Sequence, residues 1–378
     1  MICCVNCFRD YEIRGIIESI GHKGVCPICH SENVWIFDSD LHENITDFEE
    51  KIESILEIYK TEAELDDFFP EEGKNSIEKH LAKDWNIFSV GEEGIRTIIE
   101  YIVSASWMLD YELLWEKVGV PELYDAGYLE ENSVMGKYEW KDFKNYLRNE
   151  NRFHSKYINP DELAIVLKDT KVTLNEGTKL YRARISGEQK YKSGEMGAPP
   201  DDKAGAGRVN SKGISCLYLA SQRHTAVKEI RASVYDYVTI ATFRLNRSVE
   251  VLDLSEIAMK SPFYEADSKV NFLINQKHLA QIAFDISKPL ARSDSDLDYL
   301  PTQYISDLAK YLGYDGVKYN STFDSSTYNV ALFDGSVCSC KYTKRYLVEN
   351  AEYTLSNREL QRSSEKGAEL LTKCRTCR

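Results

Sequence analysis

Two cysteine pairs near the start of the chain have the spacing of a metal site. Cys4-x-x-Cys7 and Cys26-x-x-Cys29 are separated by eighteen residues, and two such pairs can present four thiolates tetrahedrally to one zinc ion. A bound zinc would also supply the folding free energy that so short a segment does not obtain from burial. Because four thiolates leave no open coordination position, we predict a structural site. The neighbours able to replace one of these ligands are Cys3, His22 and His30.

Four further cysteines, Cys338, Cys340, Cys374 and Cys377, lie toward the other end of the chain. One interpretation is a second zinc site. Their spacing is irregular, however, and free thiols are common in a reducing compartment. We therefore favour free thiols over a second metal.

Polar and charged side chains recur beside short apolar runs in the second half of the chain. The first run, Leu180–Arg184, is predicted to be a strand. Such a strand projects Arg182 and Arg184 to one side and Tyr181 to the other. The other clusters are Gly205–Asn210, Cys216–Ala220 with Thr225, Ala226 and Glu229 on the helix that follows it, Tyr299–Gln303, and Gly316–Ser321.

Arg148 and His154 stand six positions apart at the end of a predicted helix. A histidine can act as general base or acid on a ribose hydroxyl while an arginine holds the scissile phosphate. The pair resembles the Arg-Asn…His signature of HEPN domains, whose active members are metal-independent RNases that combine two such motifs across a dimer. Basic residues also gather at helix C-termini because they interact favourably with the helix dipole. We favour this second interpretation.

The elements that would position these residues follow from hydrophobic periodicity. Residues 1–38 have short, alternating apolar runs and predict a small β-rich unit. From residue 45 onward the apolar positions recur every three to four residues, which predicts an amphipathic helix. Further helices are expected at about 76–83, 92–109 and 139–150, so this region is predicted to be a helical bundle. The apolar face of the first helix would consist of Ile45, Phe48, Ile52, Ile55, Leu56 and Tyr59.

Beyond Pro160 the pattern changes to short strands separated by helices, which predicts a mixed α/β domain. Strands are expected at 179–184, 217–220, 237–245 and 249–254, and helices near 222–233, 271–284 and 302–312. The polar segment Ser186–Gly213 is longer than most connections and is a candidate binding loop. The mostly charged stretch Thr354–Arg378 is predicted to be a peripheral tail.

The chain of 378 residues is long enough for two or three domains. It carries 61 acidic and 47 basic side chains, and the net charge of −14 makes nucleic acid a poor partner. No run of about 18 apolar residues occurs, and the N-terminus lacks the features of a signal peptide. We therefore expect a soluble, cytoplasmic protein with no membrane partner.

Taken together, the clusters in the second half of the chain resemble the RES domain family over residues 174–347. The resemblance implies a fold similar to that of ADP-ribosyltransferases and an enzyme that consumes NAD; several such domains are toxins of toxin–antitoxin pairs. The family loop commonly reads Gly-Gly-Arg-Trp-Asn, and this chain has valine at the aromatic position. The arginine, glutamate and serine of the family fall on Arg182, Glu229 and Ser321. The residues implied to contact NAD are Tyr181, Arg208, Asn210 and Tyr218.

The chemistry of these residue types fits that activity. Breaking the nicotinamide–ribose bond develops positive charge on the sugar, and a carboxylate bonded to a ribose hydroxyl interacts more strongly as the charge appears. We expect Glu229 to have this role. A planar guanidinium pairs with phosphate through two hydrogen bonds, so Arg182 or Arg208 would hold the pyrophosphate. Ser321 would orient the ribose or the carboxamide by a hydrogen bond.

We therefore predict an α+β protein of four parts. A zinc ribbon at 1–40 is followed by a helical HEPN-like domain at 41–168, a mixed α/β, ADP-ribosyltransferase-like RES domain at 169–350 and a polar tail at 351–378. The predicted function is an NAD-degrading effector or toxin, acting as a glycohydrolase or phosphorylase, with NAD as substrate and zinc as a structural ion. Its partners would be an antitoxin or immune-system protein and a second copy bound through the helical domain. The alternatives are transfer of ADP-ribose onto a protein, an RNase that uses Arg148 and His154, and a zinc-stabilised adaptor without activity.

Overall fold

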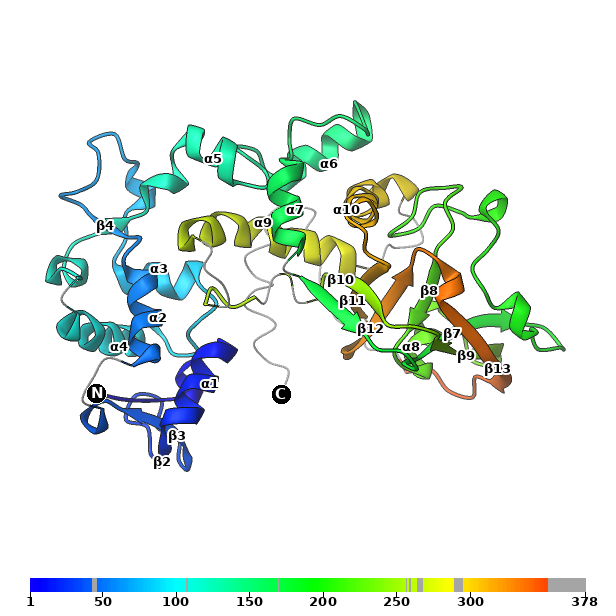
Figure 1. Cartoon of the computed structure of the whole chain (residues 1–378), viewed down its shortest axis with the longest axis horizontal. Helices are drawn as coiled ribbons and strands as arrows, with labels where there is room; N and C mark the ends of the chain where they lie inside the picture. Colours follow the sequence, from blue (N-terminus) through cyan, green and yellow to red (C-terminus); the bar gives the residue numbers. More distant parts are fainter. Residues whose placement is uncertain are drawn as a thin grey trace. The chain divides into compact units, whose positions relative to one another are not determined.

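The computed structural model describes residues 1–42, 46–106, 108–168, 170–255, 257, 260–263, 268–288, 295–321 and 323–352. The chain divides into two compact units (Figure 1). The N-terminal unit consists of Met1–Lys137 with Met259–Gln276, and the C-terminal unit of Tyr138–Ala258 with Lys277–Arg378. Within the described residues, no helix is both long enough and apolar enough to cross a membrane.

The first part of the N-terminal unit is a three-stranded antiparallel sheet with one helix. Strands β1 (Ile2–Cys4) and β2 (His22–Gly24) both pair with β3 (Val34–Asp38). Between β1 and β2 lies helix α1 (Tyr11–Ile20). The Asp10 side chain accepts a hydrogen bond from a backbone amide of the first turn at 3.0 Å and caps this helix. The alternating pattern of this segment predicted a β-rich unit, and the structure shows that the segment also contains a helix.

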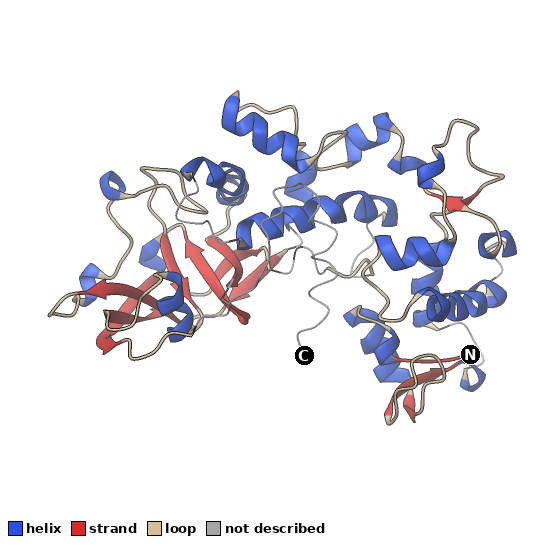
Figure 2. Cartoon of the chain, turned by 180° about the vertical axis from the view of Figure 1, so that it is seen from behind, coloured by secondary structure: helices blue, strands red, loops and turns tan. Residues whose placement is uncertain are grey.

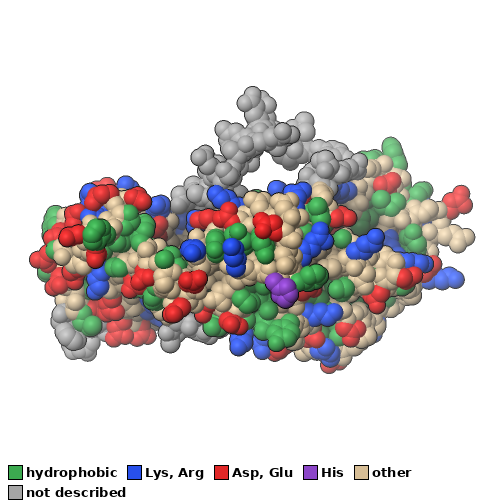
Figure 3. All heavy atoms as spheres, turned by 90° about the horizontal axis from the view of Figure 1, so that it is seen from above, with side chains coloured by type: hydrophobic (Ala, Val, Ile, Leu, Met, Phe, Trp, Pro, Cys, Tyr) green, Lys and Arg blue, Asp and Glu red, His purple; other side chains and the backbone are tan. Residues whose placement is uncertain are grey.

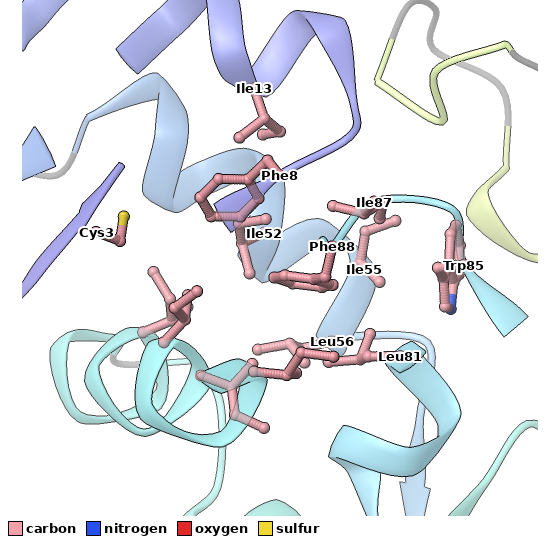
Figure 4. Close-up of a cluster of buried hydrophobic side chains, with 14 of the residues drawn as sticks. Cys3, Phe8, Ile13, Ile52, Ile55, Leu56, Leu81, Trp85, Ile87 and Phe88 are labelled. Atoms are coloured by element: carbon pink, nitrogen blue, oxygen red, sulfur yellow. The ribbon is translucent and has the colours of Figure 1, made fainter. Parts of the chain in front are cut away.

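The interior of the N-terminal unit is one continuous apolar cluster. It joins side chains of the cysteine-containing segment to side chains of helices α2 (Asp47–Leu56), α3 (Ile77–Asp84) and α4 (Glu92–Ala105) (Figure 4). For example, Phe8 packs edge-to-face on Phe48, with ring centroids 5.6 Å apart. The cysteine-containing segment thus gains stability from burial against the helices, in addition to any contribution from a metal.

The helices predicted for this region correspond to observed ones. Helices α3 and α4 lie where helices at about 76–83 and 92–109 were expected, and α2 is the predicted amphipathic helix. Ile45 lies outside the described residues, and Tyr59 is buried after α2 has ended. The remaining elements of the unit are β4 (Lys60–Thr61), β5 (Val118–Gly119) and α5 (Ala126–Asn132).

The C-terminal unit is built around one eight-stranded mixed sheet (Figure 2). Strands β10 and β11 are parallel, and the other neighbouring strands are antiparallel. The mixed α/β fold predicted for this part of the chain is confirmed. In spatial order the strands are β13 (Cys338–Leu347), β9 (Tyr237–Leu245), β7 (Lys179–Ser186), β8 (Leu217–Ala220), β12 (Asp324–Leu332), β11 (Gly316–Ser321), β10 (Val249–Asp253) and β6 (Lys171–Leu174).

Helices α6 (Trp140–Asn149), α7 (Pro160–Lys168), α8 (Arg223–Glu229) and α10 (Leu300–Tyr311) belong to the same unit as this sheet. Helix α9 (Lys269–Ser287) contributes residues to both units. The sequence had grouped α6 and α7 with the preceding helices. The domain boundaries at residues 40, 168 and 350 stay a prediction.

Strand alternation gives the large sheet two different faces. One face carries large apolar side chains that form the main core, among them Leu180, Leu217, Leu219, Phe243, Val330 and Leu332. The other face, which we call the α8 face, packs against helix α8 through smaller residues, namely Ala183, Ala220, Ala226, Val238 and Ile240. Strands β7 and β8 meet in a single residue pair, Tyr181 with Ala220, whereas β7 pairs with β9 along its full length.

Charge is distributed unevenly along the chain. Residues 1–137 hold 30 of the 61 acidic side chains but 11 of the 47 basic ones. On the face drawn in Figure 3, acidic side chains gather over the N-terminal unit at the left. Residues 138–378, which include the large sheet, therefore have a small excess of basic groups. The overall net charge of −14 is therefore no argument against binding of an anionic ligand to the C-terminal unit.

Candidate functional site

Glu229, at the end of helix α8, is held by two donors from neighbouring strands. Its Oε1 accepts a hydrogen bond from Ser321 Oγ at 3.2 Å and another from Asn329 Nδ2 at 2.6 Å. Ser321 and Asn329 are buried, whereas Glu229 itself is exposed. Because both donors approach Oε1, the second oxygen, Oε2, can face a ligand. The structure thus brings together the glutamate and the serine that the sequence assigned to one site.

The strands beneath α8 bring several of the expected residues into one row. Tyr181 of β7 pairs with Ala220 of β8. Ala220 also pairs with Asn329 of β12, which pairs in turn with Tyr319 of β11. Paired residues point to the same side of a sheet, so all four lie on the α8 face. Tyr218, two residues before Ala220, lies on that face as well. We call these five residues the floor of the candidate site.

The loop Gly205–Asn210 is tied to this floor and to helix α10. The Tyr218 hydroxyl donates to Asn210 Oδ1 at 2.6 Å. Gln303, buried near the start of α10, donates through Nε2 to the carbonyl oxygens of Gly207 and Asn210, at 2.8 and 2.9 Å. Burial raises the pKa of Tyr218, so its hydroxyl stays protonated and remains a donor. The loop therefore has a defined position over the floor.

Arg208 is the cation that this loop brings to the floor. Its guanidinium carbon lies 5.2 Å from the ring centroid of Tyr319, and its Nη1 donates to the carbonyl oxygen of Ile286. Thr302 donates through Oγ1 to the backbone carbonyl of Arg208. Val209, the next residue, is buried. The aromatic ring next to the Arg208 guanidinium is that of Tyr319.

Arg182 and Arg184 project from the side of β7 opposite Tyr181, as strand alternation predicted. Arg182 Nη1 and Arg184 Nη2 both donate to the carbonyl oxygen of Gly197, at 3.0 and 3.1 Å. Burial, assisted by the charge of Arg184, lowers the pKa of Arg182 to about 10, so this guanidinium is still charged near neutral pH. Among the hydrogen bonds of the described residues, none joins Arg182 to Glu229 or Ser321.

The four cysteines of the N-terminal pairs come together in space. The sulfur atoms of Cys4 and Cys7 lie 3.8 Å apart, those of Cys4 and Cys29 3.3 Å, and those of Cys7 and Cys26 3.6 Å. All four sulfurs are within 4.8 Å of one another. Tetrahedral zinc, bound at about 2.3 Å from each sulfur, requires sulfur–sulfur distances of about 3.8 Å. This donor set therefore fits zinc.

The alternative ligands considered for this site do not belong to the group. Cys3 is buried in the apolar cluster opposite Phe37 of β3. His22 and His30 are exposed. The structure thus gathers the four cysteines that the spacing predicted.

The cysteines near the other end of the chain are described only in part. Cys338 begins strand β13 and donates through Sγ to the Gly335 carbonyl at 3.6 Å. Burial raises the pKa of its thiol to about 11, which favours the unreactive protonated form. Cys374 and Cys377 lie outside the described residues. Free thiols therefore stay a prediction for this group.

Arg148 and His154 are placed near the end of helix α6. Arg148 Nη1 forms an ion pair with Asp298 Oδ1 at 3.0 Å. A phosphate would have to compete with this carboxylate for the guanidinium. His154 is exposed, and its backbone carbonyl accepts a hydrogen bond from the Tyr146 hydroxyl at 3.1 Å. The nuclease interpretation of this pair stays an untested prediction.

Asn329 and Gln303 hold the candidate site together, but neither was assigned a role from the sequence. The signal at Asn329 was an amide in the apolar run that continues through Val330–Leu332. A buried amide needs hydrogen-bond partners, so its presence in such a run indicates a specific contact. The partner is Glu229, 100 residues away along the chain, and it becomes visible only when the strand order is known.

Three comparisons relate this chain to known proteins, and the match to a family model supports the expected family for residues 179–355. Among solved structures, the chain is similar to one described as the crystal structure of the M. tuberculosis MbcT-MbcA toxin-antitoxin complex, with 14% sequence identity and a TM-score of 0.31. That similarity covers 50% of this chain and 94% of the other chain. No curated protein matches the chain in sequence. Residues 179–355, which include Glu229, Ser321 and Asn329, match the family model of the RES domain.

Proposed function

We propose that the RES domain of this chain binds NAD and breaks the bond between nicotinamide and ribose. The observation that carries the proposal is the orientation of Glu229, whose Oε1 accepts hydrogen bonds from Ser321 and Asn329. A carboxylate fixed in this way at an exposed position is preorganised for charge that develops on a bound sugar. The match of residues 179–355 to the RES domain supports the same activity.

The proposed reaction proceeds through a sugar with oxocarbenium character. Glu229 Oε2 accepts a hydrogen bond from a ribose hydroxyl, and this bond strengthens as the ribose becomes positive. The carbon–nitrogen bond breaks with its electron pair on nicotinamide, which leaves as a neutral molecule. Water or phosphate then adds its oxygen to the ribose carbon. Hydrolysis gives ADP-ribose and releases one proton to solvent, while phosphorolysis gives the ADP-ribose phosphate ester.

Arg208 and Tyr319 would hold the rest of the nicotinamide nucleotide. The Arg208 guanidinium above the Tyr319 ring presents a cation to the phosphates. Because burial raises the pKa of Tyr319, its hydroxyl is a neutral hydrogen-bond donor and does not repel the dinucleotide. Arg182 projects from the side of β7 opposite Tyr181 and is close enough to Tyr218 for their charges to interact; in this proposal it orders the segment around Gly197.

We also propose that Cys4, Cys7, Cys26 and Cys29 bind one structural zinc ion. The sulfur geometry supports it, because the distances of 3.3 to 3.8 Å are close to the edges of a tetrahedron around zinc. Zinc would fix β1 and the turn that carries the second cysteine pair. The four thiolates have no part in NAD cleavage in this proposal.

The biological role that goes with this reaction is that of an NAD-depleting effector or toxin. We infer it from the resemblance of the domain to the RES family, which also implies a restraining antitoxin or immune-system protein. Expression of the wild-type chain should then lower cellular NAD and arrest growth, and Glu229→Gln should do neither. Growth arrest by the Glu229→Gln chain would contradict this role.

The direct test is NAD loss by the purified full chain, measured with and without phosphate and with candidate protein acceptors. We expect free nicotinamide from wild type and at least a hundredfold slower release from Glu229→Gln, because electrostatic groups of this kind contribute about that much to kcat. Glu188→Gln removes an exposed carboxylate from the same unit and should behave as wild type. NAD that stays intact under all three conditions contradicts the proposal.

The same assay separates the rival functions. The identity of the second product distinguishes hydrolysis, phosphorolysis and transfer of ADP-ribose onto a protein. If RNA is cleaved instead, and if His154→Ala abolishes that cleavage while Glu229→Gln does not, the chain is a nuclease. If NAD binds without turnover, the chain is an adaptor.

A further inference from the structure

Helix α6 carries charged and aromatic side chains along one side (Figure 1). They recur at three- and four-residue intervals and are Trp140, Phe143, Lys144, Leu147 and Arg148. The helix ends before residue 179, so it lies outside the residues that match the RES domain. Sequence patterns suggested Arg148 as half of a nuclease motif, and the proposed function gives it no role.

Arg208 depends on two neighbouring elements for its place over the Tyr319 ring. Its Nη1 donates to the carbonyl oxygen of Ile286, in the last turn of helix α9. Its backbone carbonyl accepts a hydrogen bond from Thr302 Oγ1 near the start of α10, and Gln303 holds the rest of the loop. A guanidinium has five N–H donors, so the contact with Ile286 leaves others for a phosphate. The end of α9 and the start of α10 therefore fix the position of this cation.

The end of α9 is anchored to α6 through Asp285, the residue before Ile286. Asp285 Oδ2 accepts hydrogen bonds from Trp140 Nε1 at 2.7 Å and from Lys144 Nζ at 2.8 Å. Trp140 is buried, and the Asp285 side chain is 19% exposed, so solvent screens these contacts only in part. A displacement of Asp285 also displaces the neighbouring carbonyl that accepts from Arg208.

The start of α10 is anchored to the same helix by two further contacts. Arg148 Nη1 pairs with Asp298 Oδ1 at 3.0 Å, and Asp298 belongs to the short 3₁₀ helix that leads directly into α10. The Phe143 ring packs edge-to-face on Tyr304, which follows Gln303, with ring centroids 5.2 Å apart. One helix therefore braces both elements on which Arg208 rests.

We propose that helix α6 positions the phosphate-binding cation of the NAD site, with Lys144 and Arg148 as positioning residues. The inference rests on the proposed function and extends it, because it makes a helix outside the RES match part of the same site. Neither side chain touches the substrate, since Lys144 acts through α9 and Arg148 through α10. Loss of either contact weakens the hold of Arg208 on the NAD phosphates and leaves the chemistry at Glu229 intact.

The first test measures KM and kcat for NAD cleavage by the full chain. Lys144→Glu places a carboxylate beside Asp285 and repels it, so the KM should rise about five- to tenfold, as expected for loss of one charge-assisted contact. The kcat should stay close to the wild-type value. Arg148→Glu opposes Asp298 and should have the same effect through α10. Lys141→Glu makes an equal change of charge at an exposed position of the same helix and should keep both constants.

A double-mutant cycle separates positioning from general destabilisation. Arg208→Gln removes the cation that α6 is proposed to hold, and by itself it should raise the KM. If Lys144 acts through Arg208, the addition of Lys144→Glu to Arg208→Gln should raise the KM no further. A substitution that merely loosens the fold would act independently of Arg208, and its effect on the KM would multiply with that of Arg208→Gln.

Rescue by a second substitution gives an independent check. Asp285→Asn keeps an acceptor for Trp140, removes the negative charge and adds an amide donor. The chain with both Lys144→Glu and Asp285→Asn should therefore recover most of the wild-type KM. A double variant that keeps the high KM would contradict an effect through this contact.

The outcomes distinguish this inference from the proposed function. NAD that stays intact with wild type removes both. If Arg208→Gln itself leaves the KM unchanged, the phosphate-binding role of Arg208 is wrong and α6 has no cation to position, while cleavage at Glu229 stands. If Arg208→Gln raises the KM, the positioning role alone is overturned by either of two results. Lys144→Glu and Arg148→Glu may leave the KM unchanged, or their effects may multiply with that of Arg208→Gln.

Discussion

Asn329 and Glu229 are 100 residues apart in the chain, yet Asn329 Nδ2 donates to Glu229 Oε1 at 2.6 Å. The asparagine is buried in the middle of an apolar sheet, and the glutamate is exposed at the end of a short helix. A buried amide is costly unless it is hydrogen-bonded, so this contact stabilises the sheet as well as the carboxylate. The same contact fixes which carboxylate oxygen is directed toward the sheet.

Asn329 should therefore act as a positioning residue for NAD cleavage. Asn329→Ala removes a hydrogen bond to a charged group, which is worth about 1.5 to 3 kcal/mol. We expect kcat to fall about ten- to a hundredfold while KM changes little, because the lost contact orients Glu229 and does not bind the substrate. Asn320→Ala, on the neighbouring strand with an exposed side chain, is the matched control and should keep wild-type kcat. A rise in KM with normal kcat would assign Asn329 to substrate binding instead.

Gly207 and Gly205 should respond differently to the same substitution. A Cβ atom on Gly207 would lie 2.5 Å from Asn210 Oδ1 and 2.6 Å from the Tyr218 hydroxyl, whereas one on Gly205 meets nothing within 4 Å. We expect Gly207→Ala to lower the free energy of unfolding by about 1 to 3 kcal/mol and to slow NAD cleavage, since it displaces the loop that carries Arg208. Gly205→Ala should leave both unchanged. Urea denaturation and nicotinamide release measure the two effects, and identical behaviour of the two variants would exclude a fixed loop.

The chain should contain one zinc ion, which elemental analysis of the purified protein measures. Cys26→Ser should lose the metal and lower the thermal unfolding temperature, because three thiolates bind zinc much less tightly than four. Part of the fold should persist, since Phe8 and its neighbours also pack against helix α2. Cys3→Ala leaves all four ligands in place and should retain the zinc. Loss of metal in Cys3→Ala but not in Cys26→Ser would shift the site to the other cysteine.

His278 should make the C-terminal unit less stable at acid pH. Burial lowers its pKa to about 4, and its Nδ1 has no hydrogen-bond partner among the described residues. Above pH 6.5 the His278 imidazole is unprotonated in both the folded and the unfolded chain. As the pH falls from 6.5 to 4, it becomes protonated in the unfolded chain only. Stability is therefore lost over that range, by about 3 kcal/mol at about 1.4 kcal/mol per pH unit.

The measurement for His278 is the free energy of unfolding in urea at pH 7 and at pH 5. His278→Gln should show a smaller loss between these pH values than wild type. The exposed His154 gives the matched control, His154→Gln, which should lose as much as wild type. If all three chains lose the same amount, the titration of His278 does not contribute.

Local patterns in the sequence predicted several elements at their observed bounds. Apolar runs marked β8 and β9 because both strands are buried and contain few polar residues. Helix α8 was expected to extend to residue 233 but ends at Glu229, and Arg231 has a φ of 51°, which is incompatible with a continuing helix. Helix α1 was missed although Ile13 and Ile17 have helical spacing, because the cysteine pairs on both sides indicated strands and turns.

The candidate site was predictable where a residue type alone indicates its chemistry, as for Glu229 and Ser321. Their contact and the role of Asn329 were not, because both depend on the pairing of β12 with β8 and β11. From the sequence alone, Arg182 and Arg208 were equivalent candidates for holding the pyrophosphate. Only the structure shows that Arg182 is bonded to the Gly197 carbonyl, whereas Arg208 lies over the Tyr319 ring.

The single bridge between Tyr181 and Ala220 has a mechanical consequence for the sheet. Elsewhere neighbouring strands are joined by several residue pairs, so bending would break several backbone hydrogen bonds at once. Where β7 meets β8, a small rotation of one strand against the other breaks few backbone hydrogen bonds. Helix α8 packs against β7 and β9 on one side of this joint and against β8 on the other, so the short helix that ends in Glu229 also holds the two groups of strands at one spacing.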